Sequence, residues 1–289
     1  MHNLRGEVIK IRSMMKTSIQ LLVLFILLGR YGTCGFTRTS QNLYSSQHSA
    51  INYHTTKMVT HTWSIFLNSH RNHRVSTTLH SLSAEDGISR MDSAPQYFHS
   101  RKSYEEIGLN AKVMSGVLKS LGLERPSKIQ ALAFKEIYTG ANCILADQTG
   151  SGKTFAYLLP LLQRIVELQR EKIIPSPPES RAPYIVVITP TTELALQVSK
   201  VVRSVANALK FRSACITAIS DMDAEQKKLR LGAEILISTP GRIIALLEKN
   251  QVSLSRTQAI VLDEADVLFL DESFPLKPIG EAVADVCDH

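Results

Sequence analysis

Beyond residue 110, the apolar positions of this chain follow two alternating patterns. In some segments they recur at helical spacing, as at Val113, Val117, Leu118 and Leu121. Between these segments lie short apolar runs rich in β-branched residues, which are typical of buried strands. The pattern predicts helices over residues 110–121, 127–138, 155–170, 192–208, 223–231 and 241–249, and strands over 142–146, 184–189, 213–219, 235–239 and 259–263.

This regular alternation predicts the fold class. Strands that alternate with helices favour an α/β fold with a mostly parallel sheet and helices on both of its faces. Pro126 interrupts the chain before Ser127, which is a good helix N-cap, so a helix is expected to begin there. The folded domain is expected over residues 98–289, after an extension of different composition.

The start of the chain resembles a secretory signal peptide. Lys10, Arg12 and Lys16 precede an uninterrupted apolar run at residues 21–28. That run is well short of the roughly 20 residues that a membrane-spanning helix needs, but it suits the apolar core of a signal peptide. Residues 1–35 are therefore interpreted as a signal peptide, with a short signal anchor or a buried helix as the alternatives.

Residues 36–97 are interpreted as a disordered transit-peptide-like segment and linker. From Gly35 to Ala84 there is no acidic residue, and Ser, Thr, Arg and His are frequent. A signal peptide followed by such a segment resembles the two-part presequence of proteins routed into secondary plastids. A plastid location is therefore expected, with a mitochondrial presequence starting at Met14 or Met15 as the alternative. No stable membrane association is expected in the mature form.

The net charge of +7 comes from this extension. Residues 1–84 hold nine Lys or Arg and one acid, a net of +8, so the remaining residues have a net charge of −1. Charge alone therefore gives no reason to expect that the domain binds nucleic acid. The four cysteines are far apart, which indicates neither a disulfide framework nor a metal site and suits a reducing compartment.

Residues 147–154 read Asp-Gln-Thr-Gly-Ser-Gly-Lys-Thr, between a predicted strand and a predicted helix. In this context glycines let backbone N–H groups turn toward phosphate oxygens, and the helix N-terminus adds favourable partial charge. Lys153 is expected to reach the β- and γ-phosphates of a nucleotide, and Thr154 to ligate Mg²⁺. Asp147 is unusual at the first position, because an acid is unfavourable near phosphate.

A pair of acids, Asp263 and Glu264, ends the predicted strand at 259–263. A carboxylate at such a position holds Mg²⁺, and the next carboxylate can act as a base toward the attacking water. Together with the phosphate loop, this pair predicts a site for a nucleoside triphosphate with Mg²⁺.

Further segments resemble the motifs of one family. Residues 122–130 resemble its Q motif, 190–195 its motif Ia, 239–242 its motif Ib, and 263–266 read Asp-Glu-Ala-Asp. The chain resembles the first RecA-like domain of a DEAD-box ATP-dependent RNA helicase over roughly residues 98–289. The resemblance implies a P-loop fold, an ATP hydrolase that remodels RNA duplexes, ATP and Mg²⁺ as cofactors, and RNA as a partner.

The resemblance also implies roles for individual residues. Gln130 would read adenine, with the bidentate geometry that glutamine offers to N6 and N7. Tyr104 stands near the place of an aromatic residue that stacks on the base, and Asp266 would relay the nucleotide state. The expected ATP contacts are Tyr104, Arg125, Gln130, Gln148, Thr149, Gly150, Ser151, Gly152, Lys153 and Thr154.

Catalysis is expected from Glu264, Asp263 and Lys153, and the metal ligands are expected to be Thr154 and Asp263. A second set of residues would grip the RNA backbone, where contacts position the nucleic acid without reading its sequence. These residues are Pro190, Thr191, Thr239, Gly241 and Arg242.

The sequence also departs from the family's pattern. Thr192 stands where motif Ia usually has Arg, and no Gly-Gly turn precedes motif Ib. No Ser-Ala-Thr motif follows Asp266, so the fold is expected to be truncated before the strand of the third motif, with a central gap in the sheet. The second RecA-like domain is expected to be absent, and the chain alone to have little ATPase activity.

Two other functions remain open from the residues. One is a catalytically incomplete nucleotide- or RNA-binding fragment, or decoy protein. The other is a different P-loop enzyme such as a DNA helicase, against which the Gln130 motif argues.

Overall fold

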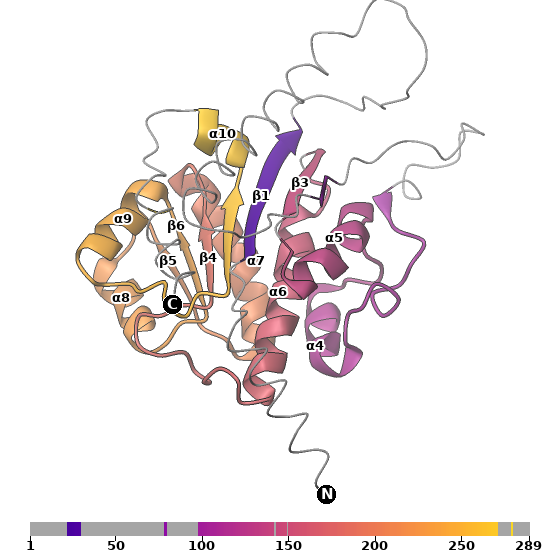
Figure 1. The fold of residues 1–289 in the computed structure, drawn as a ribbon, viewed down its shortest axis with the longest axis horizontal. Helices are drawn as coiled ribbons and strands as arrows, with labels where there is room; N and C mark the ends of the chain where they lie inside the picture. The colour runs from indigo at the N-terminus through magenta and orange to yellow at the C-terminus, as the bar shows by residue number, and fades with distance from the viewer. Residues whose placement is uncertain are drawn as a thin grey trace, which may run out of the picture.

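A parallel sheet lies at the centre of the structure (Figure 1). This computed structural model describes residues 22–29, 78–79, 98–141, 143–148, 150–270 and 279. The strand order is β2-β3-β1-β7-β4-β6-β5, and all neighbouring strands are parallel. The strands are β1 (Leu22–Gly29), β2 (Thr78–Leu79), β3 (Cys143–Gln148), β4 (Ile185–Ile188), β5 (Ser213–Ile216), β6 (Ile235–Ser238) and β7 (Ala259–Asp263).

Helices cover both faces of this sheet. They are α4 (Ala111–Leu121), α5 (Lys128–Thr139), α6 (Lys153–Arg170), α7 (Thr192–Leu209), α8 (Met222–Arg230), α9 (Pro240–Glu248) and α10 (Ala265–Leu270). Successive strand side chains point to opposite faces. Val187 and Val261 therefore pack with α4–α7, whereas Val186 and Ile260 pack with α8, α9 and α10 on the other face.

Side-chain caps fix where several helices begin. Ser127 and Gln130 form a capping box at α5, in which each side chain bonds the other residue's backbone N–H. The Thr191 hydroxyl accepts from the Leu194 N–H at the start of α7, and Asp221 caps α8. These caps place the first turns of the helices next to the strands that precede them.

The structure confirms the α/β alternation predicted from residue 110 onward, with shifts of a few residues at element ends. The largest shift is in β5, which ends at Ile216 rather than at residue 219. There the chain leaves the sheet because the Ser220 hydroxyl accepts from the Thr217 N–H at 2.8 Å and so closes a turn. The short helix α10, directly after the Asp-Glu pair, was not predicted.

The centre of the sheet differs from the expectation. The predicted gap between the strand before the phosphate loop and the strand before Asp263 is occupied by β1. This strand pairs with β3 from Leu24 to Gly29 and with β7 from Leu22 to Ile26. Unpaired backbone groups buried in a sheet are costly, and a continuous apolar run suits a strand covered on both faces. The prediction of a gap was therefore wrong.

A second strand also comes from the segment before the domain. Thr78 and Leu79 of β2 pair with Cys143 and Ile144 of β3. The other residues of the proposed presequence lie outside the described residues, so its boundaries stay predictions. Within the part of the chain that the structure describes, no helix has the length and apolar character needed to cross a membrane.

We expect removal of residues 1–29 to open β3 and β7 to solvent, because each loses its hydrogen-bonding neighbour β1. Amide hydrogen exchange of peptides spanning Cys143–Gln148 and Ala259–Asp263 should accelerate relative to the full chain. Peptides from β6, which pairs with β4 and β5 and not with β1, are the internal control. Equal exchange of β3 and β7 in both proteins would contradict this pairing.

Candidate functional site

The predicted functional segments meet at one edge of the sheet. Because the strands are parallel, their carboxyl ends share an edge, which is where ligands bind in open α/β sheets. The phosphate loop begins in the last two residues of β3, and the Asp-Glu pair lies at the end of β7, with Asp263 as its last residue. Thr191 follows β4, and Thr239 follows β6. Segments that are far apart in the sequence, such as residues 147–154 and 263–264, are therefore side by side (Figure 1).

The phosphate loop is a tight turn that leads into α6. Gly150 and Gly152 have φ values of 81° and 89°, a left-handed conformation that favours glycine. Lys153 is buried, and its Nζ donates to the carbonyl oxygen of Asp147 at 2.7 Å. Thr149 lies outside the described residues, as does the side chain of Gln148.

The ammonium group of Lys153 is partly removed from water. Burial lowers the pKa of its ammonium group, while four nearby carboxylates act in the opposite direction. These are Asp147, Asp263, Asp266 and Glu264. The lysine thus lies between the phosphate loop and the acids at the end of β7.

The loop also holds a polar group that fits a phosphate. The Ser151 hydroxyl is buried and has no hydrogen-bond partner within the described part of the chain. A buried polar group normally has a partner, and phosphate oxygens are suitable acceptors. Gly152 is the N-cap of α6 and gives it no side-chain cap, which leaves the helix N-terminus suited to an anion.

The acids after β7 are tied to α6 by a residue that the sequence did not single out. The Tyr157 hydroxyl is buried and donates to Asp263 Oδ2 at 3.3 Å. Burial raises the pKa of Tyr157, and Asp263 raises it further, whereas a hydrogen bond with Thr154 lowers it. Tyr157 therefore links both predicted metal ligands. It lies three residues after Thr154 on α6, a spacing that places the two on one helix face and could have revealed it.

The surroundings of Asp263 fit a divalent cation. Burial raises the pKa of its carboxyl, opposed by hydrogen bonds from Tyr157 and the Glu264 N–H and by the charge of Lys153. No group of three His, Cys, Asp or Glu within the described residues could hold a metal. Mg²⁺ prefers a few protein oxygens together with phosphates and water, so Thr154 and Asp263 suit a metal that arrives with a nucleotide.

Glu264 lies in a strained turn between β7 and α10. Its φ is 54°, which is uncommon for a residue other than glycine, and its N–H donates to Asp263 Oδ1 at 3.1 Å. Strained backbone of this kind concentrates at functional sites. Asp266 follows in the first turn of α10, where a negative charge is favourable.

The Q motif is bonded directly to the phosphate loop. Gln130 Nε2 donates to the carbonyl oxygen of Gly152 at 3.2 Å, and Gln130 Oε1 accepts from the Ser127 N–H at 3.0 Å. Oε1 also accepts from the Tyr104 hydroxyl at 3.0 Å. The structure thus brings Tyr104 and Gln130 together beside the loop. Tyr104 is only 3% exposed, and burial raises its pKa to about 12.

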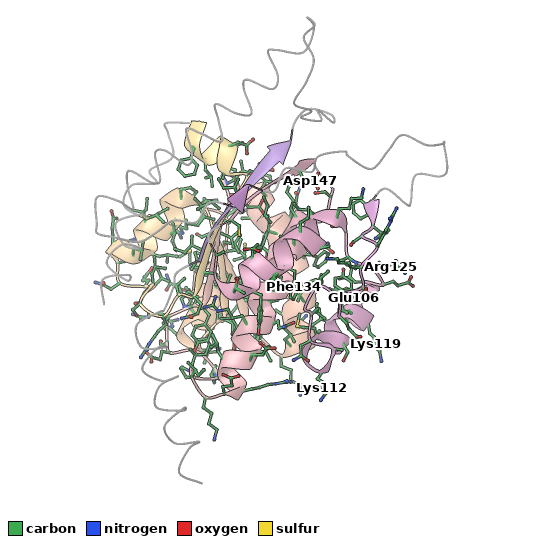
Figure 2. The ribbon with its side chains drawn as sticks, turned by 45° about the vertical axis from the view of Figure 1, so that its right-hand side comes forward. Glu106, Lys112, Lys119, Arg125, Phe134 and Asp147 are labelled. Carbon is green, nitrogen blue, oxygen red and sulfur yellow. The ribbon has the colours of Figure 1, made fainter. Side chains whose placement is uncertain are left out.

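Arg125, also predicted to contact the nucleotide, is not bonded to the phosphate loop. It is exposed and donates to the carbonyl oxygen of Arg101 at 3.4 Å. Figure 2 shows Arg125 beside Glu106 and away from Asp147. The positive charge of Arg125 contributes to lowering the pKa of Glu106, after the hydrogen bonds from Ser103 and the charge of Lys102. Arg125 is thus exposed in this structure, and its predicted contact with the nucleotide stays a prediction.

The predicted RNA contacts gather at two adjacent helix N-termini. Ile188 of β4 pairs with Ser238 of β6, so the starts of α7 and α9 lie side by side. Thr191 is exposed at the first, and Gly241 is exposed at the second. Helix N-termini attract phosphate through their free N–H groups and partial positive charge. Pro190, by contrast, is buried.

Two features of this region were not foreseen. A guanidinium nitrogen of Arg242 contacts Met222 Sδ at the start of α8, and its buried Nε has no partner within the described residues. The Thr239 side chain makes no capping bond at α9. The predicted RNA residue Arg242 is therefore turned toward α8, a contact that depends on packing and has no signal in the sequence.

Replacement of Gly152 by alanine tests the junction between the loop and the Q motif. A Cβ at this position would lie 2.6 Å from Gln130 Nε2, on a backbone with φ of 89°. Gly152→Ala should lower the free energy of unfolding by about 1–3 kcal/mol in chemical denaturation. Gly116→Ala is the control, because its Cβ would meet nothing within 4 Å in the middle of α4, and it should be neutral or stabilising. Equal stability of the Gly152→Ala variant and the parent would contradict the close approach.

Comparisons with known proteins agree with this geometry. Residues 127–276 match the family model described as DEAD/DEAH box helicase. The chain is 42% identical over 178 residues to DEAD-box ATP-dependent RNA helicase 50 of Oryza sativa subsp. japonica, which covers 61% of this chain and 27% of the relative. It is 39% identical over 184 residues to the protein of the same name from Arabidopsis thaliana, with 63% and 23% covered.

A solved structure is similar as well. The RNA helicase Prp28 from Chaetomium thermophilum, bound to ADP, matches with a TM-score of 0.53 and 31% identity, over 63% of this chain and 42% of that chain. The chain spans about a quarter of the length of the two plant relatives. The matched family model covers more than half of the chain and includes the phosphate loop and the Asp-Glu pair. This chain belongs to the DEAD/DEAH box helicase family.

Proposed function

We propose that this chain binds ATP with Mg²⁺ and RNA, as the first RecA-like domain of an ATP-dependent RNA helicase that couples ATP hydrolysis to remodelling of RNA duplexes. The observation that carries the proposal is the bond from Gln130 Nε2 to the Gly152 carbonyl oxygen. It joins the segment predicted to read adenine to the loop predicted to hold phosphate. The relatives are named ATP-dependent RNA helicases, which favours this function over that of a binding-only decoy.

The position of each group in this site gives it a role in binding or hydrolysing the nucleotide. Lys153 and the N-terminus of α6 bind the phosphates, with Ser151 as a further hydrogen-bond donor. Thr154 and Asp263 would hold Mg²⁺, which supplies positive charge against the charge that develops on the transferred phosphoryl group. Glu264 accepts a proton from the attacking water, and its left-handed backbone conformation joins β7 to α10 beside Asp263.

The neighbouring helix N-termini supply the surface proposed for RNA. The start of α7 at Thr191 and the start of α9 at Thr239 and Gly241 would receive successive phosphates. Because backbone N–H groups and hydroxyls read no base, we propose recognition of RNA without strong sequence preference. The composition of residues 1–84 supports import into an organelle, most simply a plastid, and a fluorescent fusion of residues 1–97 would show the location directly. A signal peptide over residues 1–35 would include β1, so the mass of the imported protein would show whether this strand is retained.

ATP binding tests the first half of the proposal. Lys153→Ala removes a cation that would bond phosphate, so it should weaken ATP–Mg²⁺ binding by about 10- to 100-fold in titration calorimetry, which corresponds to loss of one bond between charged groups. Lys112→Ala is the control, because Lys112 is exposed on α4. Equal affinity of the Lys153→Ala variant and the parent would contradict the proposed phosphate site.

RNA binding tests the second half, through two glycines that share an open environment. A Cβ at Gly241 or at Gly116 would meet nothing within 4 Å, and both residues are exposed, so a side chain can start at either position without a clash. Gly241→Leu should cover the N-terminus of α9 and weaken binding of single-stranded RNA about 10-fold in fluorescence anisotropy, as expected for loss of about one charge-assisted contact. Gly116→Leu should bind RNA like the parent. If both variants bind RNA as tightly as the parent, the RNA does not lie at the N-terminus of α9.

A further inference from the structure

The hydrogen-bonding capacity of Gln130 is nearly exhausted by the protein itself. Its Oε1 accepts from both the Ser127 N–H and the Tyr104 hydroxyl, each at 3.0 Å. An amide oxygen has two acceptor sites, so both are filled. Its Nε2 donates one hydrogen to the Gly152 carbonyl oxygen and keeps one for a ligand. Towards a bound base, Gln130 therefore offers a donor and no free acceptor.

The hydrogen-bonding groups that Gln130 has free do not match those of adenine. The edge of adenine with N6 and N7 presents one donor and one acceptor, whereas the same edge of guanine presents the acceptors O6 and N7. The remaining Nε2 hydrogen of Gln130 can serve an acceptor on either base. Pairing with the adenine amine needs Oε1, which must first release one of its two present partners.

Tyr104 is the partner that can be released. The bond from the Ser127 N–H is part of the capping box that begins α5, and its loss would unpair a backbone donor in a buried position. The Tyr104 hydroxyl belongs to a side chain from the segment before α4, 26 residues earlier in the chain. Because Tyr104 is buried and its pKa is about 12, the hydroxyl stays a protonated donor at neutral pH.

We propose that the Tyr104 hydroxyl is a specificity-determining group, which competes with the exocyclic amine of adenine for Gln130 Oε1 and so weakens the preference of this chain for ATP over GTP. The inference rests on the proposed nucleotide site. It concerns the hydroxyl alone, because phenylalanine would keep the ring and its packing while leaving one acceptor site of Gln130 free.

The test compares three nucleotides on the full chain and its Tyr104→Phe variant, with Mg²⁺ present. ATP carries the amine, purine riboside triphosphate lacks it, and GTP has an acceptor in its place. Tyr104→Phe should bind ATP about 2- to 10-fold more tightly, the range expected for removal of one competing hydrogen bond. The affinities for purine riboside triphosphate and GTP should not change, because neither offers a donor to Oε1 at this position.

Tyr138→Phe is the matched control. Tyr138 also donates its hydroxyl to a side chain, Glu167 Oε2 at 2.5 Å, but from the far end of α5. It should leave all three affinities unchanged. A purely structural role of Tyr104 would shift the three nucleotides together, and that result, or an unchanged or weaker affinity for ATP, would overturn the inference while leaving the nucleotide site intact. Absence of binding of any nucleotide by the parent chain would overturn the proposed site and this inference with it.

Discussion

Parallel pairing of the strands is the constraint on which the rest of this structure depends. Because all of the strands run in one direction, every loop that follows a strand emerges at the same edge of the sheet. The loop after β3 and the acids after β7 can act on one ligand only for this reason. The pairing in turn requires that the central strands have partners on both sides, since their backbone groups are buried. The occupant of the position between β3 and β7 therefore matters as much to the site as the residues that touch a ligand.

Much of the fold could be predicted because the spacing of apolar residues along the chain indicates which side chains are buried. The strand β4 is a continuous apolar run, β6 is apolar up to its last residue, Ser238, and α7 between them has one apolar face. The position of β1 could not be predicted in this way. An apolar run such as residues 22–29 satisfies the requirements of a signal peptide and those of a buried strand equally well, because its composition carries no information about its partner. The helix α10 was missed because the sequence after Asp263 was interpreted only through its acids.

The candidate site likewise contains residues that have a local signal in the sequence and residues that depend on contacts between distant segments. The positions of Lys153, Asp263 and Glu264 in the fold were predictable because their signals are local, with a glycine-rich turn before a helix and acids at the end of a strand. The parts supplied by Tyr157 and by the Tyr104 hydroxyl depend on contacts across 106 and 26 residues of sequence. Arg125 and Arg242 show the reverse case. The sequence predicts ligand contacts for both cations but not their partners within the protein. Arg125 lies at the surface beside Glu106 and Arg242 lies against Met222, because packing decides where a long side chain points.

The register of β4 and β7 has a consequence for how two ligands would influence each other. Ile188 pairs with Leu262, so the strand that leads to Thr191 and the strand that leads to Asp263 are direct neighbours, about 5 Å apart. Ligands held at the two strand ends would share one piece of rigid backbone. Thermodynamic linkage then makes their effects equal: any factor by which RNA tightens the binding of nucleotide is the factor by which nucleotide tightens the binding of RNA. If the two ligands favour each other's binding, release of one would lower the affinity for the other, and no further conformational trigger would be needed.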